Sequence, residues 1–175
     1  MITPDDKDWT WTLESECREC GFAAGDVAPG DIAQLVLAFT APWPEVLARP
    51  DAHARRDETT WSPLEYGAHV RDVCRIFTER VGLMRDEDSP TFANWDQDQS
   101  AVDDDYAGQD PRTVADEIAS AATGLSAAYE SVDAGEWERS GIRSNGSRFT
   151  VLTLGQYGLH DLRHHLWDVD AEPAR

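Results

Sequence analysis

Four amphipathic segments constrain the fold of this chain more than any other feature of its sequence. In each segment apolar residues recur every three or four positions, so that a helix would be apolar on one side and polar on the other. The segments cover residues 31–47, 62–86, 110–132 and 151–168. Because each apolar stripe must be buried, these segments predict an all-α fold, a four-helix bundle.

Helix start and break signals support these boundaries. Ser62 is placed to cap the second helix, and Glu65 three residues later completes a capping box. Asp110, followed directly by a proline, predicts the start of the third helix in the same way. Pro42 and Pro44 predict a kink in the first segment, or its division into two short helices.

The connection between the third and fourth helices predicts a small β-hairpin over residues 141–150. Asn145-Gly146 in its centre favours a tight turn with positive φ. The longer connection 86–110 is acidic and weakly patterned, but it contains three aromatic residues, so we expect part of it to pack on the bundle. These residues are Phe92, Trp95 and Tyr106.

Length and charge bound the class of protein. A chain of 175 residues predicts one domain, 1–175, in which residues 1–29 form an N-terminal extension. Its formal net charge of −19 argues against nucleic acid and anionic lipid as partners. We find neither a long apolar run nor a signal-peptide pattern, so we expect a cytoplasmic protein without a membrane span. Of 15 basic residues only Lys7 is a lysine, which is typical of a GC-rich bacterial genome.

The three cysteines do not predict a disulfide scaffold. Cys17 and Cys20 form a Cys-x-x-Cys motif, but no second pair follows it and no βαβ pattern surrounds it. A zinc ribbon and a thioredoxin-type site are therefore both disfavoured. We interpret the pair as local structure or as an oxidisable pair, with a functional redox motif as the alternative.

Three histidines form the strongest candidate site. His160 and His164 are four residues apart and so project from one side of the fourth helix, next to its leucine stripe. His69 lies on the apolar face of the second helix, where a buried imidazole needs a hydrogen-bond partner or a metal. His165 falls about 140° around the helix from His160, so we leave it out of the site.

Three imidazoles suit a divalent transition metal, with Zn²⁺ or Ni²⁺ expected first and Fe²⁺ or Co²⁺ also compatible. Three protein ligands leave a coordination position open, which is typical of catalytic rather than structural sites. A metal in such a site lowers the pKa of a bound water or thiol. The residues alone do not indicate whether the metal would activate a water or a thiol.

Two motifs carry a resemblance to a known family. Residues 61–73, Trp-Ser-Pro-x-Glu-x-x-x-His and the residues after it, resemble the second-helix motif of the DinB-like superfamily. Residues 159–165 are similar to its fourth-helix motif. The resemblance implies a four-helix bundle, commonly a homodimer, with a divalent metal held by His69, His160 and His164. Members include transferases and isomerases that use mycothiol or bacillithiol, and the composition favours mycothiol, the actinobacterial thiol.

Nearby polar residues have two interpretations each. Asp72 and Asp161 could orient a ligand imidazole through its second nitrogen, or could face solvent. Tyr157 and Arg163 are the candidate cofactor-binding residues; core packing is the alternative for Tyr157, and an ion pair is the alternative for Arg163. No side chain stands out as a protein nucleophile, so no catalytic residue is assigned.

The function expected from these features is metal-dependent transfer to or from a low-molecular-weight thiol, with a small-molecule substrate. A metal-dependent hydrolase is the alternative enzyme. A non-catalytic protein that binds metal or a small ligand is the alternative outside enzymes.

Overall fold

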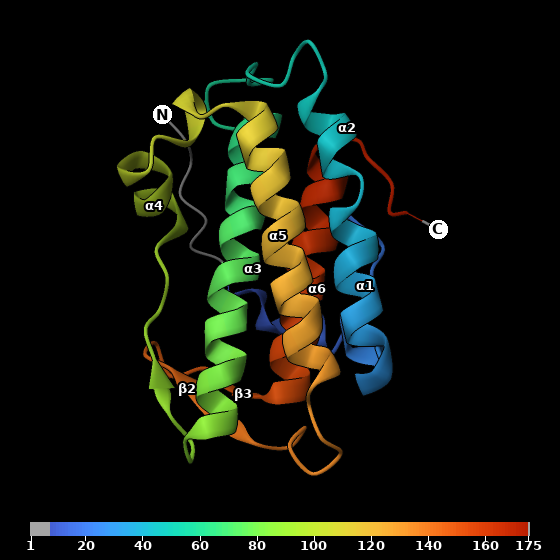
Figure 1. The fold of residues 1–175 in the computed structure, drawn as a ribbon, viewed down its shortest axis with the longest axis vertical. Coiled ribbons are helices and arrows are strands. Elements are labelled where there is room, and N and C mark those ends of the chain that lie inside the picture. Colours follow the sequence, from blue (N-terminus) through green and yellow to red (C-terminus); the bar gives the residue numbers. More distant parts are fainter. Residues whose placement is uncertain (1–7, 175) are drawn as a thin grey trace.

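The computed structural model describes residues 8–174, and four helical segments run side by side along its length (Figure 1). The segments are α1 (Ile32–Thr40) with its continuation α2 (Trp43–Leu47), α3 (Pro63–Asp86), α5 (Pro111–Glu130) and α6 (Val151–Asp168). Helices α1 and α3 each contact both α5 and α6. This arrangement confirms the predicted four-helix bundle.

The predicted helix signals act as expected. Ser62 Oγ accepts a hydrogen bond from the Glu65 backbone N–H at 3.3 Å, and the Glu65 carboxylate accepts one from the Ser62 N–H at 2.9 Å. Asp110 caps α5 by accepting a hydrogen bond from a backbone N–H in its first turn. The first segment is divided in two at Pro42, which occupies the N-cap position of α2 without a side-chain hydrogen bond. Local chemistry therefore defines where the long helices start.

The predicted hairpin is present and belongs to a three-stranded sheet. Strands β2 (Ser140–Arg143) and β3 (Arg148–Thr150) pair antiparallel, and Gly146 adopts a φ of +96° in the turn between them. Strand β1 (Thr91–Phe92), which was not predicted, pairs in parallel with the other edge of β2. The sheet closes one end of the bundle beside α3 and α6 (Figure 1).

The connection between α3 and α5 packs on the bundle as expected. It contains β1, the short helix α4 (Gln97–Asp103) and a 3₁₀ turn at Tyr106–Gly108. The Tyr106 ring is fully buried, and its hydroxyl donates a hydrogen bond to Asp72 Oδ2 at 2.6 Å.

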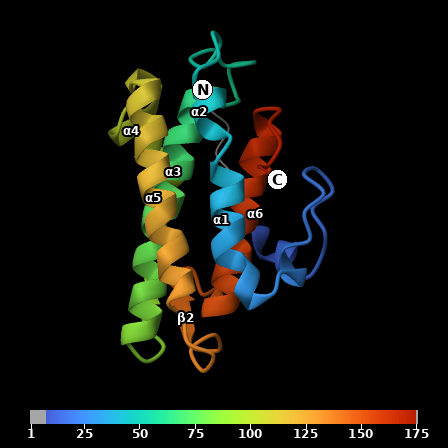
Figure 2. The same ribbon diagram turned by 45° about the vertical axis from the view of Figure 1, so that its right-hand side comes forward.

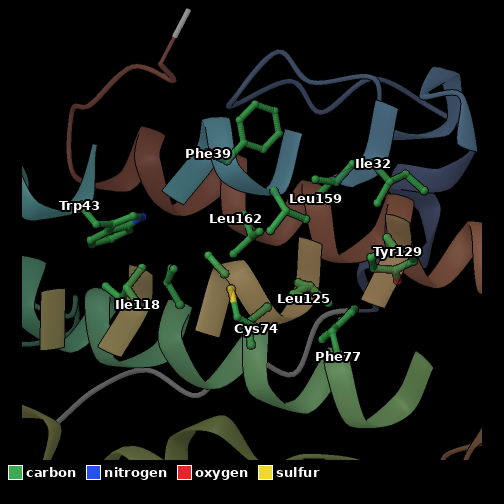
Figure 3. Packing of buried hydrophobic residues seen from close by; sticks show 14 of the residues in the cluster. Ile32, Phe39, Trp43, Cys74, Phe77, Ile118, Leu125, Tyr129, Leu159 and Leu162 are labelled. Carbon is green, nitrogen blue, oxygen red and sulfur yellow. The ribbon is translucent and has the colours of Figure 1, made fainter. Parts of the chain in front are cut away.

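The core lies between the four helical segments and is closely packed (Figure 3). Leu159 and Leu162 of α6 are buried in it, as is the Cys74 thiol of α3. Gly158 allows α6 to approach α3, because a Cβ at this position would lie 2.8 Å from the Phe77 ring. Over residues 8–174, no helix combines the length and apolar character that crossing a membrane requires.

The N-terminal segment packs along α6 (Figure 2). Its 3₁₀ turns at Trp9–Leu13 and Ala24–Asp26 both contact that helix. Gln156 Nε2 donates hydrogen bonds to the carbonyl oxygens of Gly25 at 3.1 Å and Val27 at 2.9 Å. These contacts bring the Cys-x-x-Cys motif against the histidine-rich turn of α6.

Candidate metal centres and cavity

A cavity of about 210 Å³ opens beside the C-terminal half of α6. Polar side chains from α6, here called its floor, and aromatic side chains from α6 and from three other parts of the chain, here called its walls, line this cavity. The floor residues are His160, Asp161, His164, His165 and Asp168. The aromatic wall residues are Trp9, Trp61, Tyr66 and Tyr157.

Two metal-ligand clusters lie on adjacent faces of α6. The first contains His69, Asp161 and His165, with one ligand atom from each lying within 4.8 Å of the others. Asp161 Oδ1 is 3.3 Å from His69 Nε2 and 3.2 Å from His165 Nε2. The remaining ring nitrogen of His165, Nδ1, is 2.8 Å from Asp168 Oδ2. Asp161 therefore joins an imidazole of α3 to an imidazole of α6.

The charges in this first cluster follow from these contacts. Burial alone would raise the pKa of Asp161, but hydrogen bonds from His165 and His69 hold the pKa well below its usual range. Burial opposes charge on His165 as well, yet its hydrogen bonds to Asp161 and Asp168 raise its pKa to about 10. Burial lowers the pKa of His69 despite the nearby Asp161 carboxylate. At neutral pH the metal-free cluster thus holds the Asp161 carboxylate, the His165 imidazolium and the neutral imidazole of His69.

The donors of the first cluster suit a divalent transition metal. Two imidazole nitrogens and a carboxylate oxygen are a known ligand set for Zn²⁺ and for non-haem Fe²⁺, and they leave coordination positions for other ligands. The His69 ring is fully buried and stacks on Trp95, with centroids 5.0 Å apart and planes 6° from parallel. Within the described part of the chain, His69 Nδ1 is buried without a hydrogen-bond partner. Packing therefore leaves Nε2, 3.3 Å from Asp161 Oδ1, as the ring nitrogen that is available to a metal.

The second cluster contains Cys17, Cys20, His160 and His164. All four residues are buried, and their ligand atoms lie within 4.8 Å of one another. Cys17 Sγ is 3.6 Å from His164 Nδ1, while His164 Nε2 is 3.4 Å from a carboxylate oxygen of Glu19. Burial raises the pKa of Cys20 to about 11, and burial together with the neighbouring His164 lowers the pKa of His160 to about 4.

The structure divides the three predicted histidine ligands between the two clusters. It brings His160 and His164 together but places His69 beside Asp161 and His165. Residues 161 and 165 lie about 100° around α6 from residues 160 and 164, so the two pairs face different neighbours. Helix α3 meets the former face and the N-terminal segment meets the latter. The sequence-based prediction missed this division because it assigned ligands only to the face of α6 that carries His160, and so left out His165.

The other candidate residues have definite surroundings. Tyr157 lines the cavity and stacks on Phe77 at 6.2 Å. Arg163 is outside the cavity lining, and its guanidinium lies 3.5 Å from a Glu172 carboxylate oxygen. Asp72 is bound by Arg71 at 2.8 Å and by Tyr106, so this carboxylate stabilises the bundle. Of the two aspartates considered, only Asp161 is in contact with His69.

Comparison with known proteins agrees with this architecture. The fold is that of YfiT from Bacillus subtilis, described as a probable metal-dependent hydrolase with an unusual four-helix bundle topology. The two structures have a TM-score of 0.70 over 79% of this chain and 82% of that chain, at 14% sequence identity. The chain belongs to the DinB superfamily, whose family model matches residues 40–169. No curated protein matches the sequence. Cys17 and Cys20 lie before the matched region.

Proposed function

We propose that this protein is a metal-dependent enzyme whose divalent transition metal is held by His69, Asp161 and His165. The observation that carries the proposal is the convergence of these three donors. Asp161 and His165 line the cavity, whereas His69 is fully buried. Such a metal, when bound, acts as a Lewis acid and lowers the pKa of a water or thiol ligand. Asp168 would keep His165 oriented by accepting a hydrogen bond from its Nδ1–H.

The cavity lining favours an uncharged or cationic small-molecule substrate. Three aspartates line it, whereas none of the described lining residues is a lysine or an arginine. Thr59, Thr60 and Gln97 supply neutral hydrogen-bonding groups to the lining, and the aromatic walls supply apolar contact. An anionic substrate would find no lysine or arginine among these side chains to bind it. A metal at the cluster would offset part of the negative charge.

The nucleophile would come from outside the protein, since no cysteine or serine is among the described lining residues. The first candidate is a low-molecular-weight thiol of the mycothiol type, and the reaction is then S-transfer to an electrophile. This choice is supported by the sequence resemblance. Arg163 would have to break its ion pair with Glu172 to bind a carboxylate on such a thiol, so we assign it no role. Tyr157 would contact the substrate as part of the cavity wall.

Hydrolysis is the second candidate, with water as the nucleophile at the same site. It is supported by the description of YfiT as a probable metal-dependent hydrolase. Both candidates need the same metal ligands, so they differ only in the molecule that attacks the substrate. We further propose a homodimer, as the resemblance implies, which light scattering on the purified chain would test.

The decisive experiment uses the untagged chain loaded with Zn²⁺ or Ni²⁺. Uncharged electrophiles and activated esters are supplied with and without a low-molecular-weight thiol, and product is followed by mass spectrometry. We expect turnover in the wild type and in Asp116→Asn, which removes an exposed carboxylate on α5, and loss of turnover in Asp161→Asn.

The outcomes separate the proposals. Thiol adducts would support S-transfer, and thiol-independent cleavage would support hydrolysis. Full activity in Asp161→Asn would contradict the proposed centre. Tight metal binding without turnover of any substrate would favour a binding protein.

A further inference from the structure

The cluster of Cys17, Cys20, His160 and His164 is outside the proposed catalytic centre and has its own chemistry. We propose that these four residues bind a structural Zn²⁺ in tetrahedral Cys₂His₂ coordination, which fastens the N-terminal segment to α6. Two thiolates and two imidazoles are a complete ligand set for zinc. Since four protein ligands leave no open position, the site would be structural rather than catalytic.

The geometry fits this ion. Zn–S bonds of about 2.3 Å and Zn–N bonds of about 2.05 Å at a tetrahedral angle separate sulfur from nitrogen by about 3.6 Å. The distance between Cys17 Sγ and His164 Nδ1 is 3.6 Å. All four ligand atoms lie within 4.8 Å of one another, and none of the four residues is more than 8% exposed.

The surroundings of the ring nitrogens of His160 and His164 also support a metal. His164 directs Nδ1 at Cys17 and Nε2 at the Glu19 carboxylate, which is the arrangement of a metal-bound histidine oriented by an acidic residue. His160 Nε2 is buried without a hydrogen-bond partner among residues 8–174. A buried nitrogen of this kind is destabilising unless it is bound, and coordination would satisfy it.

The local backbone presents the two sulfurs together. The Gly21 N–H donates to the Cys17 carbonyl at 2.8 Å, and the Cys17 N–H donates to the Phe22 carbonyl at 3.0 Å. Gly21 has a φ of +68°, a left-handed conformation in which glycine is favoured. A redox pair would use the same turn, but it would not account for two buried imidazoles against the sulfurs.

The site has a consequence for the cavity. The Trp9 ring lies 5.5 Å from the His160 ring and 5.1 Å from the His164 ring, and Trp9 also forms part of the cavity wall. Zinc would therefore fix one wall of the cavity as well as the N-terminal segment. Both cysteines precede the region matched by the family, so the site would be an addition made by this chain.

The test uses Co²⁺, because thiolate-bound cobalt gives a charge-transfer band that histidine and carboxylate ligands do not. The untagged, metal-free chain is titrated with Co²⁺ and then with Zn²⁺. We expect one equivalent of Co²⁺ with this band, displaced by Zn²⁺, and a band of at most about half this intensity in Cys20→Ser, because one thiolate ligand of two is removed. Cys74→Ser removes a buried thiol of α3 and should retain the band. Asp161→Asn should also retain it, which separates this site from the catalytic centre.

A measurement on the wild type avoids variants that fail to fold. The zinc-loaded chain is alkylated with and without a chelator, and the modified cysteines are mapped by mass spectrometry. We expect Cys17 and Cys20 to be protected until zinc is removed. The proposal would be overturned by the absence of the cobalt band in the wild type, by a band of full intensity in Cys20→Ser, or by alkylation that does not depend on the chelator. A Cys17–Cys20 disulfide that forms although zinc and a reductant are supplied would also overturn it.

Discussion

Gly158 of α6 packs against α3 with no room for a side chain. We therefore predict that Gly158→Ala destabilises the bundle. A Cβ added there would lie 2.8 Å from two carbon atoms of the Phe77 ring. This ring has little room to move, because it is 3% exposed and stacks on Tyr157. The added methyl group must therefore displace the Phe77 ring or move α6 away from α3.

Two effects of this substitution oppose each other. Overpacking a core position costs about 1–3 kcal/mol, whereas replacing glycine by alanine within a helix stabilises by about 1 kcal/mol. The net loss is about 0–2 kcal/mol. Gly124→Ala in α5 is the matched control, because its Cβ would meet no atom within 4 Å. The control shares the helix-propensity gain, so the difference between the variants isolates the packing cost of about 1–3 kcal/mol.

Urea denaturation of both variants, compared at equal slope, measures this difference. It corresponds to a gap in Tm of about 2–12 °C, because 1 kcal/mol shifts a chain of this size by about 2–4 °C. We also expect weaker metal binding in Gly158→Ala, since moving α6 from α3 separates Asp161 from His69. Equal stability of the two alanine variants would refute the packing argument.

Two other contacts give predictions of the same kind. Glu65→Gln should destabilise the chain by about 1 kcal/mol at pH 7, a value reduced for the partly exposed Arg55. Burial would raise the pKa of Glu65, but hydrogen bonds from Arg55 and Ser62 hold it below 4.5, so stability from this carboxylate is present above pH 4.5. The difference in free energy of unfolding between the wild type and Glu65→Gln, measured in urea, should therefore shrink as the pH falls through the folded-state pKa of Glu65. A difference that grew as the pH fell would contradict this explanation. Tyr106→Phe removes the hydrogen bond to Asp72 and should cost about 1–2 kcal/mol by thermal denaturation, with metal content unchanged; an unchanged Tm would show that the bond contributes nothing.

Most of the helical architecture could be predicted from the sequence because its signals are local. The capping box of Ser62 and Glu65, the proline break at Pro42 and the Asn145-Gly146 turn each depend on neighbours a few residues away. Strand β1 has only two residues, Thr91 and Phe92, and it forms through pairing with a distant strand. No periodicity within such a short segment could reveal it.

The candidate site could be predicted only in part because its ligands come together through tertiary contacts. The spacing of His160 and His164 correctly placed them on one face of α6. Asp161 and His165 have the same spacing, a signal that was available but was excluded by the choice of face. The missing information was the side from which α3 approaches.

The role of the cysteines depended on a still longer contact. Cys17 precedes its partner His164 by 147 positions, and nothing in the intervening sequence predicts their meeting. The available signal was the spacing of two motifs. A Cys-x-x-Cys and a His-x-x-x-His together have the ligand spacings of a Cys₂His₂ zinc site. Each motif alone is weak, because each has a common structural explanation.

Anomalous diffraction at the zinc edge, from crystals of the untagged protein grown with Zn²⁺, tests the central claim most directly. In addition to the peak of the structural zinc at Cys17, Cys20, His160 and His164, we predict a peak about 2.0–2.2 Å from ligand atoms of His69, Asp161 and His165. A map with no peak at these three residues, or with a metal held instead by His69, His160 and His164, would contradict it.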